Sequence, residues 1–191
     1  MLTLRYPRDL VMIGAIFGVA TMAWTGWAQE GPPSDAWAIV LGILSVLGIA
    51  LAALSIPLAI RNWRAGTAIE PKSMAFRVYL VVFWVEIVIA AVGGIILPLV
   101  GLERLVAPYI LLIVGVHFFA LAVVFKQNVL HLAGAVLVVV AVIAAIIPTG
   151  VAANSFWCGI VGGPVFLIIG AWCTVAGRRV LKAAKAAATP A

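Results

Sequence analysis

Charge is scarce in this chain. Asp, Glu, Lys and Arg together make up 9% of the residues, whereas hydrophobic residues make up 66%. A water-soluble domain of this composition would expose large apolar patches, so the composition indicates a protein that is solvated by lipid. Long polar linkers are also missing, and we therefore expect residues 1–191 to form a single transmembrane domain.

Motifs that carry chemistry are missing as well. The sequence has no HExxH or CxxC spacing, no Walker loop, no nucleophile elbow and no dinucleotide-binding fingerprint. Its two cysteines, Cys158 and Cys173, fall in one apolar run, roughly 22 Å apart along a helix, which is too far for a disulfide. We therefore assign no catalytic, cofactor-binding or metal-binding residue, expect no cofactor, and do not expect an enzyme.

The chain has instead a series of long apolar runs. A bilayer core about 30 Å thick requires roughly 20 apolar residues per helix. Six runs reach this length, and they cover approximately residues 10–28, 36–60, 79–100, 105–125, 129–147 and 156–176. The sequence therefore predicts an all-α fold, a polytopic membrane protein built as a six-transmembrane-helix bundle. We interpret the first run as a retained helix, because bulky Trp24 and Trp27 occupy the place of a signal-peptide cleavage site.

Basic residues predict the orientation of this bundle. Eleven of the twelve Lys and Arg residues fall before span one, between spans two and three, between spans four and five, or after span six, and Arg104 alone falls on the other side. The positive-inside rule then predicts a cell (inner or plasma) membrane protein with both termini in the cytoplasm. The net charge of +6 is part of the same signal, so we expect a lipid bilayer as partner and no nucleic acid.

Small residues indicate where helices approach closely. Such residues recur four apart in three spans, as Gly14 with Gly18, Gly159 with Gly163, and Ala90 with Gly94. We interpret these pairs as contacts within one protomer, while a homo-oligomer and an unidentified membrane partner remain open.

Proline marks one unusual position inside a span. Gly162, Gly163 and Pro164 follow one another in the sixth run. Proline lacks the amide proton that a helix needs and its ring crowds the preceding turn, so we expect the helix to bend or locally unwind there. A packing kink and a ligand-facing break are both compatible with this expectation.

Two ionisable residues fall in the middle of spans, Glu86 in the third and His117 in the fourth. Ionisable groups at this depth are costly and are usually paired, neutral or exposed to a cavity. Both lie at a similar distance from the short connection between their spans, so antiparallel helices would bring them to the same depth. We predict that they meet, either as a polar pair that locks two helices or as a site that handles a proton or a solute.

One segment resembles a known pattern. The run GVHFFALAVVF from Gly115 to Phe125 is similar to the GxHF–LA–F pattern of small, uncharacterised six-pass bacterial integral membrane proteins. The resemblance covers one span closely and the topology loosely, and this chain has Ala120 where the pattern often has proline. It implies a six-pass fold and adds weight to His117, but it implies no activity.

These patterns favour an integral membrane protein that handles a small solute or a proton, as a transporter or channel. The alternative is a non-transporting scaffold or subunit that packs against a partner or lipid, because two mid-depth ionisable residues are few for a hydrophilic transport path. Access of water to Glu86 would separate the two hypotheses. Neither the substrate nor a coupling ion follows from the sequence.

Overall fold

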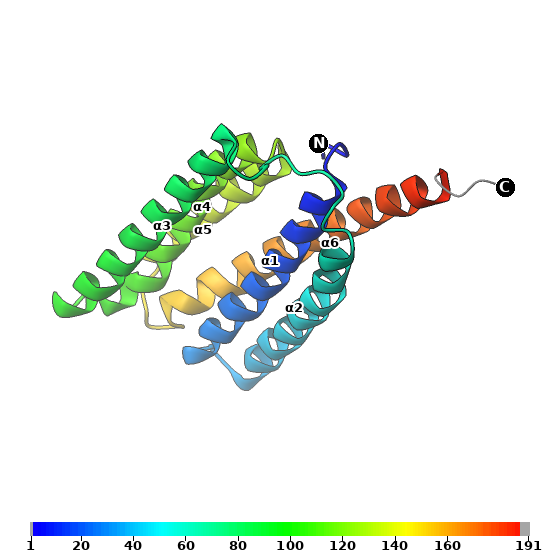
Figure 1. The fold of residues 1–191 in the computed structure, drawn as a ribbon. Coiled ribbons are helices and arrows are strands. Elements are labelled where there is room, and N and C mark those ends of the chain that lie inside the picture. Colours follow the sequence, from blue (N-terminus) through cyan, green and yellow to red (C-terminus); the bar gives the residue numbers. More distant parts are fainter. Residues whose placement is uncertain (1, 188–191) are drawn as a thin grey trace.

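The computed structural model describes residues 2–187, which form six long α-helices joined by short connections (Figure 1). The helices are α1 (Pro7–Trp27), α2 (Asp35–Arg61), α3 (Met74–Leu99), α4 (Val106–Val124), α5 (Val129–Ile146) and α6 (Asn154–Ala187), with single-turn 3₁₀-helices η1 (Ala28–Glu30) and η2 (Glu103–Leu105). All six long helices are apolar and long enough to cross a membrane. The all-α, six-helix prediction is thereby confirmed, while membrane insertion and orientation stay predictions.

Local sequence explains several helix ends. Pro7 opens α1, where its missing amide proton costs nothing. The Ser73 side chain caps α3 by accepting a hydrogen bond from the Phe76 amide at 3.1 Å. The Ala- and Lys-rich tail continues α6 to Ala187, as its composition predicts, and Pro190 lies outside the described residues.

The six helices are arranged as two groups of three. One half consists of α1, α2 and α6, and the other consists of α3, α4 and α5 (Figure 1). Contacts of α6 with α4 and α5 join the halves, and side chains of α1 and α4 meet between them. We call this interface the seam. It does not separate the first three helices from the last three, so the arrangement is not that of a sequential three-plus-three repeat.

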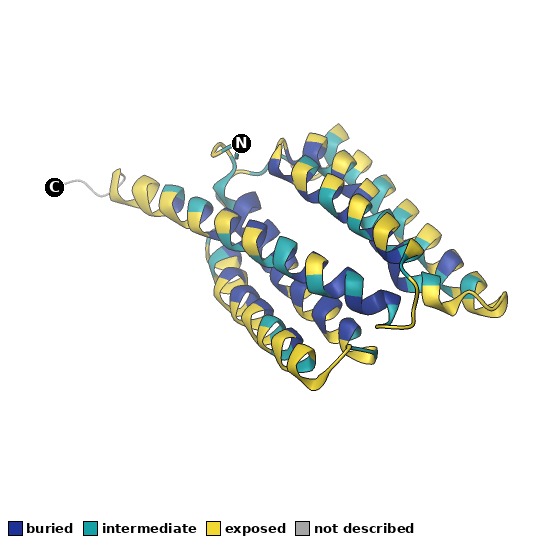
Figure 2. Cartoon of the chain, turned by 180° about the vertical axis from the view of Figure 1, so that it is seen from behind, coloured by how far each residue is buried: buried dark blue, intermediate teal, exposed yellow. Residues whose placement is uncertain are grey.

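Burial differs strongly between the helices (Figure 2). In its most hydrophobic stretch α1 has 56% of its residues buried, whereas α3 has only 6%, because α3 packs against α4 alone. A first helix at the centre of the bundle is an integral part of this fold. The exposed face of α3 is apolar, as expected for a surface that lipid or a membrane partner covers.

Close approach of helix backbones holds the α1–α2–α6 half together. A side chain at Gly14 would collide with Gly170 of α6, one at Gly18 with Gly48 of α2, and one at Gly159 with the Trp24 carbonyl of α1. These helices can approach so closely only because glycine has no side chain at the contact. The interpretation of both glycine pairs as contacts within the protomer is therefore confirmed.

The corresponding expectation for α3 is wrong in detail. A side chain added at Gly94 would meet nothing within 4 Å, so Ala90 and Gly94 do not form a tight packing pair. The close contact lies one residue earlier, where Gly93 faces the Tyr109 ring of α4. The periodicity marked the correct face of α3, but it could not identify which of two adjacent glycines lies at the contact.

Of the two outcomes expected at Gly162, Gly163 and Pro164, a bend or a local unwinding, the structure shows no unwinding. The sixth helix continues as one α-helix through this segment, with Pro164 in its interior. Neighbouring helices hold the segment, since Gly163 lies against Thr25 and its carbonyl accepts a 3.4 Å hydrogen bond from the Thr21 hydroxyl. The helix is therefore unbroken and packed against α1 here although Pro164 removes one backbone hydrogen bond, and a bend of the helix axis stays a prediction.

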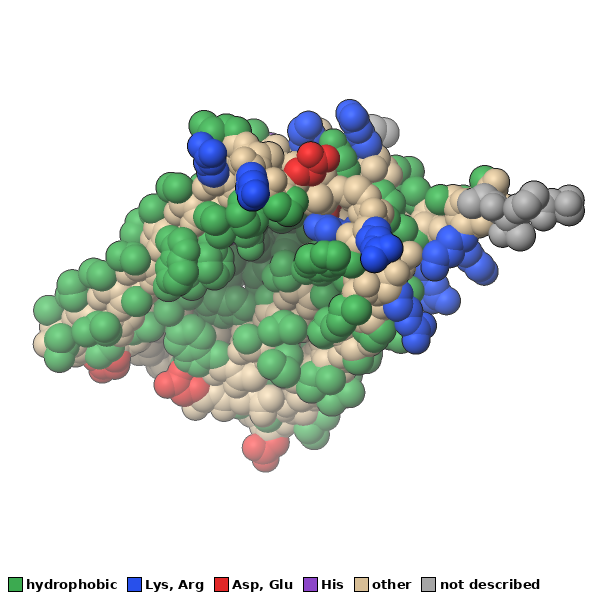
Figure 3. All heavy atoms as spheres, viewed as in Figure 1, with side chains coloured by type: hydrophobic (Ala, Val, Ile, Leu, Met, Phe, Trp, Pro, Cys, Tyr) green, Lys and Arg blue, Asp and Glu red, His purple; other side chains and the backbone are tan. Residues whose placement is uncertain are grey.

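Charge is segregated along the long axis of the bundle. In Figure 3 the Lys and Arg side chains gather at the end that carries the N-terminus and the α2–α3 connection, and most visible Asp and Glu side chains lie at the other end. We call the first the basic end and the second the opposite end. The connections that the sequence predicts to share one side of a membrane therefore also share one end of the molecule.

Candidate functional site

Glu86 and His117 meet between α3 and α4. The Nδ1 atom of His117 lies 3.1 Å from Oε2 of Glu86, and the two side chains are only 7% and 16% exposed respectively. The predicted approach of these residues is therefore confirmed. The two atoms are close without being aligned as a hydrogen bond, since Nδ1 has no partner of acceptable geometry. The contact is best described as a close polar pair, and its role stays a prediction.

A pocket of about 390 Å³ opens beside this pair. It lies between α3 and α4, and Glu86 and His117 are the polar side chains in an otherwise apolar lining. Val81 and Val116 on its rim are more than half exposed, so the pocket opens sideways on the surface of the bundle. We call it the Glu86 pocket. In a membrane this mouth would face lipid.

The other side of α4 faces the seam. Phe118, the residue after His117, stacks on Phe17 of α1 with ring centroids 5.3 Å apart. Phe166 of α6 contacts both rings edge to face, at 5.2 Å from Phe17 and 6.0 Å from Phe118. These three rings form an aromatic layer across the seam, and each is almost completely buried. Aromatic contacts of this kind contribute about 0.5–1.5 kcal/mol each beyond their burial.

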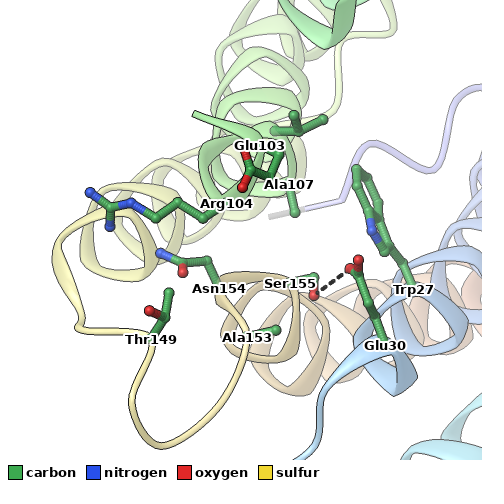
Figure 4. Close-up of a pocket in the computed structure, with 10 residues that line it drawn as sticks. Trp27, Glu30, Glu103, Arg104, Ala107, Thr149, Ala153, Asn154 and Ser155 are labelled. Carbon is green, nitrogen blue, oxygen red and sulfur yellow. Dashed lines mark hydrogen bonds between the residues drawn. The ribbon is translucent and has the colours of Figure 1, made fainter. Parts of the chain in front are cut away.

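A polar pocket of about 510 Å³ lies at the opposite end of the seam (Figure 4). Both halves contribute to it, with Trp27 at the end of α1, Glu30 in η1, Glu103 and Arg104 in η2, and Ser155 in the first turn of α6. The Ser155 hydroxyl donates a 3.1 Å hydrogen bond to Oε2 of Glu30. We call this the Glu103 pocket. Its lining includes three charged side chains (Glu30, Glu103 and Arg104) and two hydroxyl groups (Thr149 and Ser155), and no pattern in the sequence indicated it.

A smaller pocket of about 220 Å³ lies at the basic end of the seam, and we call it the Arg8 pocket. Phe17 and Phe118 of the aromatic layer line it, together with Tyr79 and Phe125 from the other half. Arg8 and Asp9 contribute its charged groups. The Arg8 and Glu103 pockets therefore lie toward the two ends of one interface, and the aromatic layer separates them.

Hydrogen bonds close the seam at the basic end. Asp9 is 1% exposed, and its Oδ2 accepts hydrogen bonds from the Ala68 amide at 2.7 Å and the Thr67 hydroxyl at 3.2 Å, which tie the α2–α3 connection to α1. The backbone of Thr3 and the side chain of Gln127 exchange two further bonds, at 2.9 and 2.8 Å, and join the N-terminal segment to the α4–α5 turn. Neither Asp9 nor Gln127 was predicted from the sequence. A carboxylate directly after Arg8 was a signal for Asp9, but no pattern marked Gln127.

Other polar groups within the helices have structural partners. Thr25 pairs with Ser45 at 2.7 Å, and Ser55 pairs with Thr174 at 2.8 Å, and both contacts hold the α1–α2–α6 half together. Cys158 and Cys173 are buried and free, as their separation predicts. Within residues 2–187, no group of three or more His, Cys, Asp and Glu side chains could hold a metal ion.

Comparison with known proteins adds no relative. No protein-family model, curated protein sequence or solved structure matches this chain. The resemblance of the Gly115–Phe125 run to a six-pass family therefore stays a likeness of one span. Any functional conclusion must come from the arrangement of the residues themselves.

Proposed function

We propose that the six helices span a cell membrane with both termini in the cytoplasm. The segregation of basic side chains at one end of the molecule supports this orientation, as does the eleven-to-one distribution of Lys and Arg. Reporter fusions after residues 33, 67, 102, 127, 152 and 191 are expected to alternate out, in, out, in, out, in. Two neighbouring fusions on the same side would refute the topology.

Within this topology we propose that the protein moves a small solute or a proton along the seam. The observation that carries the proposal is the pairing of two pockets toward opposite ends of one interface, with a layer of three phenylalanines between them. Transporters that alternate access expose a site to one side at a time by rocking one helical group against another. The hydrogen bonds at the basic end and the larger pocket at the opposite end correspond to a state that is closed toward the cytoplasm.

Glu86 and His117 are the residues that could couple a proton to this movement. His117 and Phe118 are consecutive on α4, so they project on different faces, one toward α3 and the other into the seam. A change in the polar pair that rotates or shifts α4 would therefore also move Phe118 in the aromatic layer. The pair acts through α4 in this proposal and does not line the solute path. Access of water to the seam therefore replaces access to Glu86 as the observation that separates transport from a scaffold.

Accessibility of single cysteines tests the seam without knowledge of the substrate. In a background where Cys158 and Cys173 are replaced by alanine, Leu111→Cys would place a thiol deep in the seam, at a position that is 0% exposed. We expect a membrane-impermeant maleimide to label Leu111→Cys from the non-cytoplasmic side of proteoliposomes, because the path must admit water when it opens. Val92→Cys on the exposed face of α3 is the matched control, and we expect the surrounding lipid to keep the maleimide from reaching its thiol.

The same experiment distinguishes the alternative function. The sparsely covered helix α3, whose buried residues amount to 6% of its most hydrophobic stretch, favours a scaffold or subunit that packs against a membrane partner. If Leu111→Cys is as unreactive as Val92→Cys at all pH values and temperatures at which the protein is folded, the seam is sealed and the transport proposal is wrong. The scaffold proposal would then account better for the exposed face of α3.

A further inference from the structure

The Glu103 pocket combines charges of both signs that the protein itself leaves unpaired. Glu103 and Arg104 are exposed, and in the part of the chain that the structure describes neither forms an ion pair or a side-chain hydrogen bond. Figure 4 shows the Arg104 side chain extending away from Glu103, toward the side of the pocket that carries Asn154 and Thr149. Neighbouring residues thus hold opposite charges apart across the opening of one pocket.

A second carboxylate lies on the facing wall. Glu30 comes from η1, across the pocket from Glu103, and Ser155 holds its carboxylate in place through the 3.1 Å hydrogen bond (Figure 4). Trp27 contributes an aromatic wall beside it. Carboxylates together with an indole ring form a favourable environment for an ammonium group, through charge-assisted hydrogen bonds and cation–π attraction. Two carboxylates and one guanidinium give the pocket a net negative charge, so binding of a simple anion would be disfavoured.

The guanidinium adds a requirement for an anionic group. Arginine binds phosphate or carboxylate oxygens through two parallel hydrogen bonds, which adds geometric specificity to the charge. A ligand that satisfies the whole pocket therefore carries an ammonium group at one end and an anion at the other. The volume of about 510 Å³ lies within the range of small-molecule sites, and the pocket is located just beyond the apolar part of α1, at the depth of lipid headgroups.

We propose that the Glu103 pocket binds the ammonium–phosphodiester zwitterion of glycerophosphoethanolamine, with the ammonium group toward Glu30 and Glu103 and the phosphate on Arg104. The same chemistry is available from a free solute and from the headgroup of phosphatidylethanolamine. This inference rests on the proposed insertion of the helices in a membrane, but it requires neither transport nor opening of the seam. A protein whose seam stays sealed would still bind the zwitterion.

Binding of free glycerophosphoethanolamine to the purified protein in nanodiscs of phosphatidylglycerol tests the proposal. Isothermal titration calorimetry is expected to detect saturable binding, and Arg104→Gln and Glu103→Gln are each expected to weaken it at least tenfold. Glycerophosphocholine, whose ammonium carries no hydrogen-bond donor, and inorganic phosphate, which lacks the ammonium group, are expected to bind more weakly. Arg178→Gln, at the basic end, is the matched control and should bind like the parent protein.

A second arm identifies the source of the ligand. If nanodiscs that contain phosphatidylethanolamine abolish binding of the free compound, the headgroup occupies the pocket, and if they do not, the pocket is specific for a soluble zwitterion. Both results support the assignment. Absence of binding in phosphatidylglycerol nanodiscs, or equal binding by the parent, Arg104→Gln and Glu103→Gln proteins with unchanged thermal stability, would overturn it. The cysteine-labelling test of the seam is independent of all of these binding results, so failure of one proposal can be distinguished from failure of the other.

Discussion

Replacing Glu86 by glutamine and His117 by alanine, singly and together, tests whether the two side chains depend on one another. Each is mostly buried, so water cannot easily replace the lost partner. A buried polar group left without a partner typically costs about 1–3 kcal/mol, and we expect each single substitution to lower the free energy of unfolding by an amount in this range. His117→Ala should cost more than Glu86→Gln, because it also removes a ring that contacts Phe118.

The coupling between the two substitutions is the informative quantity. Although the two atoms are not aligned as a hydrogen bond, they lie 3.1 Å apart between mostly buried side chains, so we expect an attraction on the scale of a neutral hydrogen bond, about 1 kcal/mol. The double variant should therefore lose about 1 kcal/mol less than the sum of the two single losses. Equilibrium unfolding in mixed detergent micelles, followed by circular dichroism, measures all four proteins under the same conditions.

A matched pair on the same two helices provides the control. Val88 of α3 and Val123 of α4 are 56% and 70% exposed and face away from the bundle, so Val88→Ala and Val123→Ala should cost little and should add. Strict additivity of Glu86→Gln and His117→Ala, within the error of the control cycle, would mean that their proximity carries no energetic dependence. The proposed link between the pair and α4 would then have no support.

Two further substitutions test the packing and the closure at the basic end. Gly159→Ala should destabilise the protein by about 1–3 kcal/mol, because the new methyl group would press on the Trp24 carbonyl, whereas Gly42→Ala, which meets nothing within 4 Å, should be neutral or slightly stabilising in the same unfolding assay. Asp9→Ala should release the α2–α3 connection and speed tryptic cleavage after exposed Arg64, while Asp9→Asn, which retains an acceptor, should change the cleavage rate less. Equal cleavage of all three proteins would show that Asp9 does not hold the connection.

The sequence was sufficient to predict the helices because a membrane span requires little more than length and apolar composition. It also predicted the contact of Glu86 with His117, since a short connection between antiparallel helices fixes the depth of each residue. What it could not supply is the rotation of each helix about its own axis. In a soluble helix a polar face marks the outside, but these helices are apolar on nearly every face, so periodicity does not identify the side that packs.

The failures follow from the same limitation. Phe17, Phe118 and Phe166 are ordinary apolar residues in the sequence, and only their rotation toward the seam makes them one layer. Unwinding at Pro164, one of the two expected outcomes, does not occur, because packing against α1 accompanies an unbroken α6 and local preference alone does not include that packing. Arg104 served only as an orientation signal, and the sequence did not indicate the Glu103 pocket, since nothing along the chain relates Glu30 to Glu103.

Helix α4, with the residues just before it, contributes to the polar pair, to the aromatic layer and to the Glu103 pocket. His117 contacts α3, Phe118 lies in the aromatic layer, and Arg104 and Glu103, directly before α4, reach the pocket at the opposite end. A helix is stiff along its axis, so a ligand that draws Arg104 toward the α5–α6 connection would displace the position of Phe118 as well. Binding in the Glu103 pocket and protonation of the polar pair would then bias the same element. Because such coupling is reciprocal, a substitution at Glu86 that changes zwitterion affinity would connect the two sites through α4, whereas unchanged affinity would mean that they are independent.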